Sequence, residues 1–205
     1  MEVESIMRSK GIFSAVLLVL LLTACSVRIG TKDKGEKYDR NTVVLNQDGS
    51  VSEYIRESFP DKYSVEDLIA SMDQEIMAYN EATSPDSVTR QEPVVREGMI
   101  RLEMSYRTVG DYALFNEGSM EVKEYVPGDG TIPDGGKAIE AASGATVKTE
   151  DIRVEGARVC MMYCPYDLYV NGRILYYSDG IRLEGDNHVS MENVDRGYVI
   201  YELTK

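Results

Sequence analysis

The sequence predicts an α+β fold in which antiparallel β-hairpins accompany one long and one short helix. Three observations support this fold class. An apolar stripe with helical spacing runs from Ser64 to about Thr83, and apolar residues alternate with polar ones from Met99 to Tyr106. The C-terminal third consists of short β-prone runs separated by turn residues, which predicts that it is rich in strands.

The first expected element is a β-hairpin between residues 41 and 59. Asn41–Leu45 is a short β-prone run, and Asn46–Gly49 has the composition of a turn. Residues 51–59 follow as a strand with two distinct faces. One face is expected to carry Val51, Glu53, Ile55, Glu57 and Phe59.

The long helix is expected from Ser64 to about Thr83. Ser64 is a typical N-terminal capping residue, and Glu66 and Asp67 follow in the first turn. The side chains that recur every three or four residues form a core-facing stripe. They are Leu68, Ile69, Met72, Ile76 and Tyr79.

A second hairpin and the short helix come next. Val94–Val95 and Met99–Tyr106 are expected to pair across a Glu97–Gly98 turn, with every second residue of the longer strand buried. The short helix begins at Thr108 and ends near residues 116–118, and a strand with Met120 and Val122 follows. Residues 127–150 are rich in Gly, Pro and Asp and are expected to be irregular.

The C-terminal strands are expected at 158–164, 168–176 and 198–201. The dipeptide Asn171–Gly172, between two β-prone runs, predicts a tight hairpin at this point. Further turns are expected at Asp179–Gly180 and at 184–187.

Composition excludes some classes of function. The chain has 205 residues, with 22 Lys and Arg against 35 Asp and Glu, and a net charge of −13. This charge argues against a nucleic-acid partner, because non-specific binding to phosphates needs clustered basic residues. His188 is the only histidine, so mechanisms that require two histidines are excluded.

The N-terminus has the features of an export signal. A basic stretch at 7–10 precedes 14 weakly polar to apolar residues, which are too few for a membrane-spanning helix of about 20 residues. Leu22-Thr23-Ala24-Cys25 resembles the lipobox of bacterial lipoproteins, which implies that Cys25 carries the lipid. The alternative is a plain secretory signal or a short anchor with an incidental cysteine. Met1 and Met7 are alternative starts.

These features divide the chain into three parts. Residues 1–24 are expected to be the lipoprotein signal peptide, 25–40 the lipidated cysteine with a flexible tether, and 41–205 an α+β extracytoplasmic domain. The tether holds five basic and three acidic residues, which favours proximity to an anionic membrane surface. The protein is therefore expected to be anchored to the cell membrane by lipid and to face away from the cytoplasm.

Cys160 and Cys164 are the two thiols left for the folded domain. On a straight strand, residues four apart lie roughly 13 Å from each other. A disulfide needs Cα atoms about 5–6 Å apart, so free thiols are expected unless the chain bends sharply. Two cysteines and a distant histidine do not make a structural zinc site.

Several segments together resemble a known family. They are the lipobox, VVLNQDGSVSEYIRESFPDKYSVEDLIASMDQEI, MIRLEMSYRTVGDYALFN and VNGRILYYSDGIRLEG. The layout is similar to a family of uncharacterised small lipoproteins of anaerobic Gram-positive bacteria. The resemblance implies export, lipidation with palmitate or a similar acyl chain, and an α+β fold. It implies no reaction, ligand or catalytic residue.

One short motif suggests a cofactor. Residues 140–146, EAASGAT, are similar to the D-x-x-S-G-A-T motif of FMN-binding domains, in which the threonine is joined to the flavin phosphate. The resemblance implies Thr146 as the flavin attachment site, with Glu140 in the position of the family's aspartate. The alternative is a turn of small residues without a cofactor.

Other candidate sites have weaker support. Gly49 and Gly180 lack the acidic residue that the EF-hand register requires, which leaves a calcium site of another type or solvated acidic turns. His188 is expected at an exposed strand edge. The tyrosines of the C-terminal strands would support binding if they formed an exposed face.

We therefore expect an envelope-associated binding or interaction protein. Its partners would be the membrane, through the lipid anchor, and an envelope protein or glycan. No catalytic residue, metal or cofactor is expected, and the alternative is a redox carrier with FMN on Thr146.

Overall fold

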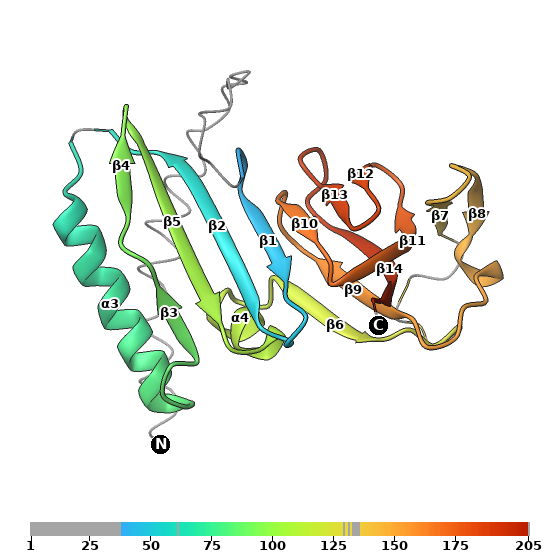
Figure 1. The fold of residues 1–205 in the computed structure, drawn as a ribbon, viewed down its shortest axis with the longest axis horizontal. Coiled ribbons are helices and arrows are strands. Elements are labelled where there is room, and N and C mark those ends of the chain that lie inside the picture. The colour runs from blue at the N-terminus through green and yellow to red at the C-terminus, as the bar shows by residue number, and fades with distance from the viewer. Residues whose placement is uncertain (1–37, 61, 129, 131, 133–135, 205) are drawn as a thin grey trace.

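The computed structural model describes residues 38–204 except 61, 129, 131 and 133–135. It contains two sheets, the helices α3 (Val65–Ala82) and α4 (Val109–Phe115), and the 3₁₀ turn η1 (Thr149–Asp151). The predicted α+β fold class, with one long helix, one short helix and a C-terminal third rich in strands, is confirmed. Figure 1 shows α3 at one end of the molecule and strands β7 and β8 at the other.

The larger sheet has the strand order β12-β13-β10-β1-β2-β5-β3, and β4 also pairs with β5. Its pairs are antiparallel except for β1 and β10, which run parallel. The strands are β1 (Thr42–Leu45), β2 (Val51–Ser58), β3 (Val88–Arg90), β4 (Val94–Arg96), β5 (Met99–Tyr106), β10 (Asp167–Tyr169), β12 (Arg182–Gly185) and β13 (His188–Ser190).

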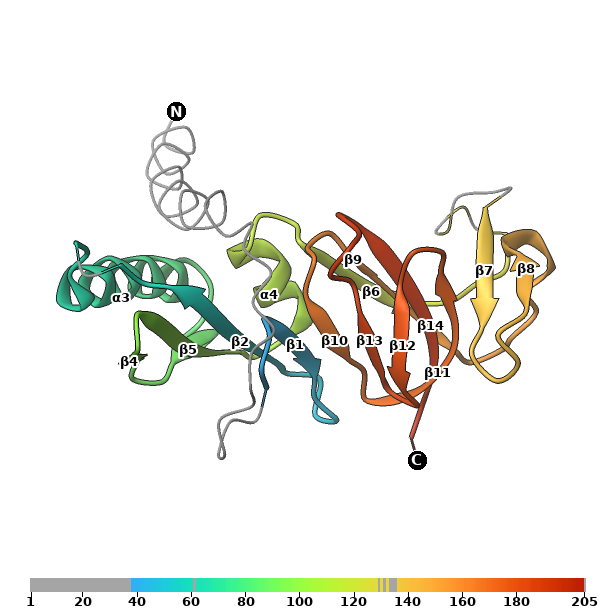
Figure 2. The ribbon, with the colours of Figure 1, turned by 90° about the horizontal axis from the view of Figure 1, so that it is seen from above.

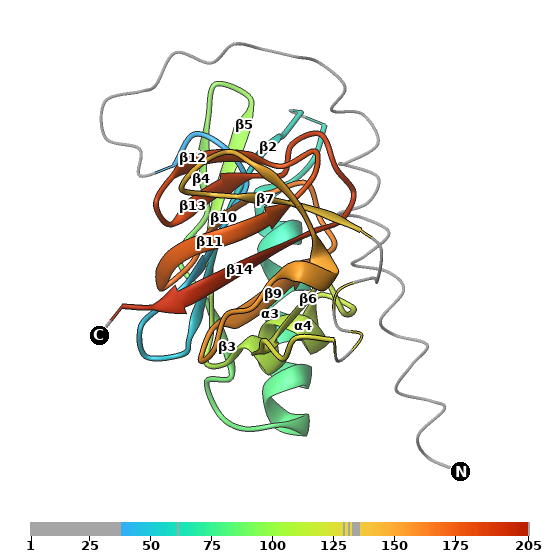
Figure 3. The ribbon, with the colours of Figure 1, turned by 90° about the vertical axis from the view of Figure 1, so that its right-hand side faces the viewer.

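The second sheet has the order β6-β9-β14-β11-β7-β8, and all its pairs are antiparallel. Figure 3, seen from the β7–β8 end, shows its strands crossing in front of the larger sheet. The strands are β6 (Met120–Glu124), β7 (Lys137–Glu140), β8 (Thr146–Lys148), β9 (Arg158–Met162), β11 (Gly172–Ser178) and β14 (Gly197–Leu203).

One hydrophobic core connects the two sheets and the helices. Alternation along β2 and β5 buries one side of each strand, as the sequence predicts. Figure 2 shows α3 and α4 on the same side of β2 and β5. Ser64 caps α3 by accepting a hydrogen bond from the Asp67 N–H, and Met72 of this helix is fully buried. The core continues between β1 and β10 of the larger sheet and β9, β11 and β14 of the second.

The predicted hairpin at Asn171–Gly172 is wrong. β10 belongs to the larger sheet and β11 to the second, so the dipeptide lies where the chain passes between sheets. A Cβ atom added to Gly172 would stand 1.9 Å from the carbonyl oxygen of Glu202. The glycine is therefore required for close backbone approach and not for a two-residue turn.

Two further expectations need correction. Residues 127–150 are not irregular throughout, because β7 and β8 form a pair within this stretch. The strand that contains Cys160 ends at Met162, so Cys164 lies beyond it. Both of these cysteines are free thiols, as expected.

Candidate functional site

The candidate site lies on the outer face of the larger sheet. Val43, Leu168 and Val189 occupy neighbouring register positions on the core side of β1, β10 and β13. Since successive side chains of a strand point to opposite faces, the residues between them point outward. The register places these in a row across five strands: Arg182, Ser190, Asp167, Thr42 and Tyr54.

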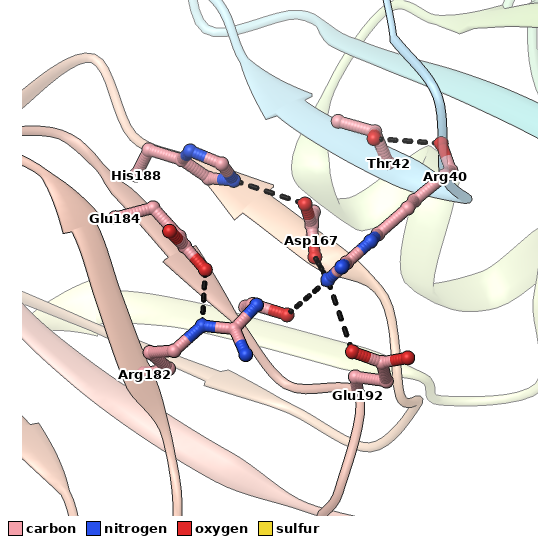
Figure 4. Close-up of polar contacts among 8 residues, drawn as sticks. Arg40, Thr42, Asp167, Arg182, Glu184, His188 and Glu192 are labelled. Atoms are coloured by element: carbon pink, nitrogen blue, oxygen red, sulfur yellow. Dashed lines mark hydrogen bonds and ion pairs between the residues drawn. The ribbon is translucent and has the colours of Figure 1, made fainter. Parts of the chain in front are cut away.

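Asp167 is the centre of a polar network on this face (Figure 4). Its Oδ2 lies 3.1 Å from Nε2 of His188, and its Oδ1 lies 3.9 Å from Nη1 of Arg40. The same Arg40 nitrogen donates to Ser190 Oγ at 3.1 Å and lies 3.0 Å from a carboxylate oxygen of Glu192. Arg40 therefore connects the segment before β1 to β10, to β13 and to the residues that follow β13.

Burial and charge act in opposite directions on Asp167. The side chain is largely covered, which by itself raises the pKa of the carboxyl. Hydrogen bonds from His188 and Ser190, together with the charge of Arg40, outweigh burial and lower the pKa below its ordinary value. An ionised carboxylate only accepts hydrogen bonds, so Nε2 of His188 carries the proton.

This network does not have the arrangement of a serine hydrolase. In such an enzyme, histidine stands between the serine and the aspartate and takes the serine's proton. Here Asp167 stands between Ser190 and His188, and Ser190 is only 3% exposed. The geometry holds His188 and Arg40 in place and does not activate a nucleophile.

Aromatic rings form a second row beside the network. The Tyr38 ring contacts Tyr54 and Tyr169, with centroid distances of 4.5 and 5.1 Å. Tyr169 in turn stacks on the His188 ring at 4.0 Å, with the two planes 10° apart. The row therefore extends over β2, β1, β10 and β13 on the outer face.

A groove of about 520 Å³ opens next to this aromatic row. Tyr38 and Tyr169 are its aromatic lining residues, and Arg173 and Asp186 contribute one charge of each sign. The remaining polar side chains are mostly amides. They are Asn46, Gln47, Asn171, Asn187 and Thr204.

The groove's polar lining is held in place by the fold. Asn171 Nδ2 donates to the Asn46 carbonyl oxygen at 3.2 Å, which links the end of β10 to the β1–β2 turn. Asn187 Nδ2 donates to the Val170 carbonyl oxygen at 3.4 Å. Gln47 and Asp186 are exposed. The groove thus combines hydrogen-bonded amides with two exposed side chains at its rim.

The chemistry of this site suits recognition of a polar ligand with little net charge. Tyrosine rings provide apolar contact area with a hydroxyl, and amides both donate and accept hydrogen bonds. The positive charge of Arg173 and the negative charge of Asp186 cancel, so the groove has no net charge. This combination is typical of polar binding sites in which orientation depends on hydrogen bonds.

Thr146, the flavin attachment site that the motif resemblance implies, lies in a different part of the molecule. It begins β8 and is exposed, on the hairpin at the far end from α3 (Figure 1). Ser143 donates a 2.5 Å hydrogen bond to Glu140 Oε2, and the Ala145 N–H donates to Ser143 Oγ. The motif is therefore an ordered, accessible turn.

The other sequence-based candidates have mixed outcomes. Cys25, the expected lipidated residue, lies outside the described residues. His188 is not at a strand edge, because β13 lies between β10 and β12 and the side chain is half-buried. The expected tyrosine face is not made by the C-terminal strands together. Of their tyrosines, Tyr169 joins the site, Tyr163 is exposed beyond the end of β9 and Tyr176 is half-buried. The others are buried: Tyr166, Tyr177, Tyr198 and Tyr201.

Most residues of the site have no signal in the sequence, among them Tyr38, Arg40 and Asp167. Tyr38 and Arg40 fall in the part assigned to the tether, yet both contact the folded domain. Asp167 showed no distinctive motif. Strand geometry offers one signal, because side chains alternate between the two faces and Thr42 and Val44 therefore face away from the core side of Val43.

A buried carboxyl group, that of Glu53, lies on the opposite side of the same sheet. Glu53 is 4% exposed and accepts hydrogen bonds from the hydroxyls of Tyr106 at 2.6 Å and Tyr112 at 3.5 Å. Burial raises its pKa to about 7, although both hydrogen bonds act in the other direction. Cys164 and Tyr166 also lie close enough to feel this charge.

No protein-family model, curated protein or solved structure matches this chain. Among the described residues, no helix is both long and apolar enough to cross a bilayer. Within the same residues, no group of three or more His, Cys, Asp or Glu side chains is placed to hold a metal ion.

Proposed function

We propose that this protein is a lipid-anchored binding protein on the outer side of the cell membrane, and that its ligand is a glycan of low net charge. The observation that carries the proposal is the row of Tyr54, Tyr38, Tyr169 and His188 beside a groove lined by amides. Sugars present apolar ring faces and many hydroxyls, which aromatic rings and amides match. An envelope protein is the alternative ligand.

Charge separates the glycan classes. The whole chain carries −13, and the groove contributes one positive and one negative side chain. Anionic polymers such as teichoic acids are repelled by this acidic surface. Neutral oligosaccharides do not experience that repulsion.

The test is a glycan array probed with detergent-solubilised full-length protein. The array carries neutral oligosaccharides, peptidoglycan fragments and teichoic acids. We expect binding to neutral oligosaccharides and none to teichoic acids. Binding to no glycan, together with specific cross-linking of an envelope protein through groove residues, would replace the glycan by a protein ligand.

Two rim substitutions connect binding to the groove. Gln47→Ala and Asp186→Ala each remove an exposed lining side chain, and each is expected to weaken binding about 5- to 30-fold, the value of one or two hydrogen bonds. Gln91→Ala and Asp151→Ala are matched controls at exposed positions away from the groove. Equal loss in all four variants would contradict a groove site.

We also propose a second candidate function, a flavin carrier, because the motif turn presents Thr146 to solvent on an ordered hairpin. Protein isolated from its native host would then be yellow, and its flavin fluorescence would survive a denaturing gel. Thr146→Ala should abolish that fluorescence. Thr89→Ala, at an exposed threonine of β3, should not. A colourless native protein excludes this function.

A further inference from the structure

Residues 38–41, which we name the strap, lie across the outer face of the larger sheet. They immediately precede β1 and stand where the expected tether meets the folded domain. Tyr38 fills the space between Tyr54 and Tyr169, and Arg40 reaches Ser190 and Glu192. The strap thus contacts β2, β10, β13 and the residues after β13.

The two ends of the strap are held in different ways. Asn41 is fixed by the fold: its Oδ1 accepts from the Arg56 N–H at 2.7 Å, its Nδ2 donates to Glu57 at 2.5 Å, and its carbonyl oxygen accepts from the Asp167 N–H at 2.9 Å. Residues 38–40 are held by contacts that each involve a side chain. The Tyr38 ring and the Arg40 guanidinium pack on or bind to the sheet. The carbonyl oxygens of Asp39 and Arg40 accept from the side chains of Arg56 at 3.4 Å and Thr42 at 2.9 Å. Residues 38–40 can therefore leave the face while β1 keeps its pairing.

The site depends on residues 38–40 being docked. Tyr38 lines the groove and is the central ring of the aromatic row. Arg40 supplies the cation next to Asp167, and Thr42 Oγ1 donates to the Arg40 carbonyl oxygen at 2.9 Å. Without these residues, the groove loses the part of its lining that Tyr38 provides, and the Asp167 carboxylate loses a positive neighbour.

We infer that the strap is a removable wall of the binding face, so that the site is complete only when residues 38–40 are docked. Docking and ligand binding then stabilise each other, because linkage between two equilibria is reciprocal. That a ligand binds the completed site rests on the proposed function, whereas the docking of residues 38–40 does not. The last three residues of the expected tether are thereby part of the site.

The experiment compares Tyr38→Ala with Tyr63→Ala. Tyr63 is a matched control, because it is 39% exposed and its ring contacts Phe59, outside the site. Trypsin cleavage after Arg40 reports undocking, and mass spectrometry identifies it by the new N-terminus at Asn41. The ring resonances of His188 report the site itself, and they are unambiguous because the chain has one histidine.

Tyr38→Ala should raise the rate of cleavage after Arg40 about tenfold, because two ring contacts are lost and the open state becomes more populated. It should also shift the His188 resonances, since Tyr169 loses its neighbour. Tyr63→Ala should change neither. Unchanged cleavage and unchanged resonances in Tyr38→Ala would overturn the inference.

The same glycan array separates this inference from the proposed function. If the unmodified protein binds and Tyr38→Ala binds at least tenfold more weakly, the strap is a wall of the site. If both bind equally while docking is weakened, the strap is not part of the site and the inference is wrong. If the unmodified protein binds no glycan, the proposed function fails, and the cleavage and His188 measurements still decide whether the strap completes this face.

Discussion

Glu53 occupies a position on β2 where the alternating pattern requires a side chain that faces the core. The groups that face its carboxyl are the hydroxyls of Tyr106 on β5 and Tyr112 on α4, and Tyr166 and the Cys164 thiol between β9 and β10. None of these is a cation. Glu53 therefore keeps its proton to a higher pH in the native state than in the unfolded chain.

This difference makes the free energy of unfolding depend on pH. Below pH 4.5 the carboxyl is protonated in both states, and Glu53 adds no pH dependence. Between 4.5 and about 7 the unfolded chain releases a proton that the native state retains, so stability falls as the pH rises. Above about pH 7 the loss is complete, at up to about 3 kcal/mol.

Glu53→Gln should remove this dependence. From pH 5 to pH 8, the unmodified protein should lose more stability than the variant in urea unfolding. The two curves should diverge between pH 5 and about pH 7 and keep a constant separation at higher pH. Glu75, whose pKa burial and the charge of Glu117 also raise to about 7, is present in both proteins and cancels in the difference. Glu121→Gln, at an exposed position, is the control. Parallel curves for Glu53→Gln and the unmodified protein would contradict the assignment.

The two thiols of the folded domain should be unreactive in the native state. Burial raises the pKa of the Cys164 thiol to about 12, with Glu53 adding to the effect, and Cys160 is fully buried with its pKa raised still further. The thiolate is the reactive form. We expect iodoacetamide at pH 8 to modify both only after denaturation, as mass spectrometry would show. Rapid labelling of native Cys160 would mean that β9 opens far more often than its burial indicates.

At the scale of elements, local patterns identified strands and helices better than they identified partners. The alternation of β2 and β5 and the capping of α3 by Ser64 follow from residues next to each other in the chain. The parallel pairing of β1 with β10 joins segments over a hundred residues apart, and no local pattern encodes it. The candidate site stands on that pairing, so Asp167 and Arg40 could not be placed together from the sequence.

Gly172 shows that an Asn-Gly dipeptide can have two structural roles. Asn-Gly is typical of tight hairpin turns, but here the glycine allows β11 to approach the backbone of β14. Gly172→Ala should destabilise the protein by about 2 kcal/mol or more, since the added methyl meets backbone atoms that cannot rotate away. Thermal unfolding checks this value. Gly110→Ala in α4, where a Cβ meets its nearest atom at 3.5 Å, is the control and should be tolerated.

At the scale of the whole molecule, the binding face and the expected anchor are close along the chain. The lipid anchor at Cys25 is a proposal that fractionation can test directly. Cys25→Ser should move the protein from the membrane fraction to the soluble fraction and abolish labelling with palmitate. Cys164→Ser, which leaves the lipobox intact, should still label and remain with the membrane. Continued labelling of Cys25→Ser would show that the lipid is attached elsewhere.

The docked position of Tyr38 limits how far the groove can lie from the membrane. Tyr38 follows Cys25 by thirteen positions. A polypeptide covers at most about 3.5 Å per residue, so the groove would stay within roughly 45 Å of the lipid surface whatever path the chain takes. The length of this segment therefore confines the groove to a narrow layer above the bilayer. If Cys25 carries the proposed lipid, a ligand has to come within this distance of the bilayer, which favours material newly delivered through the membrane over the outer layers of a cell wall.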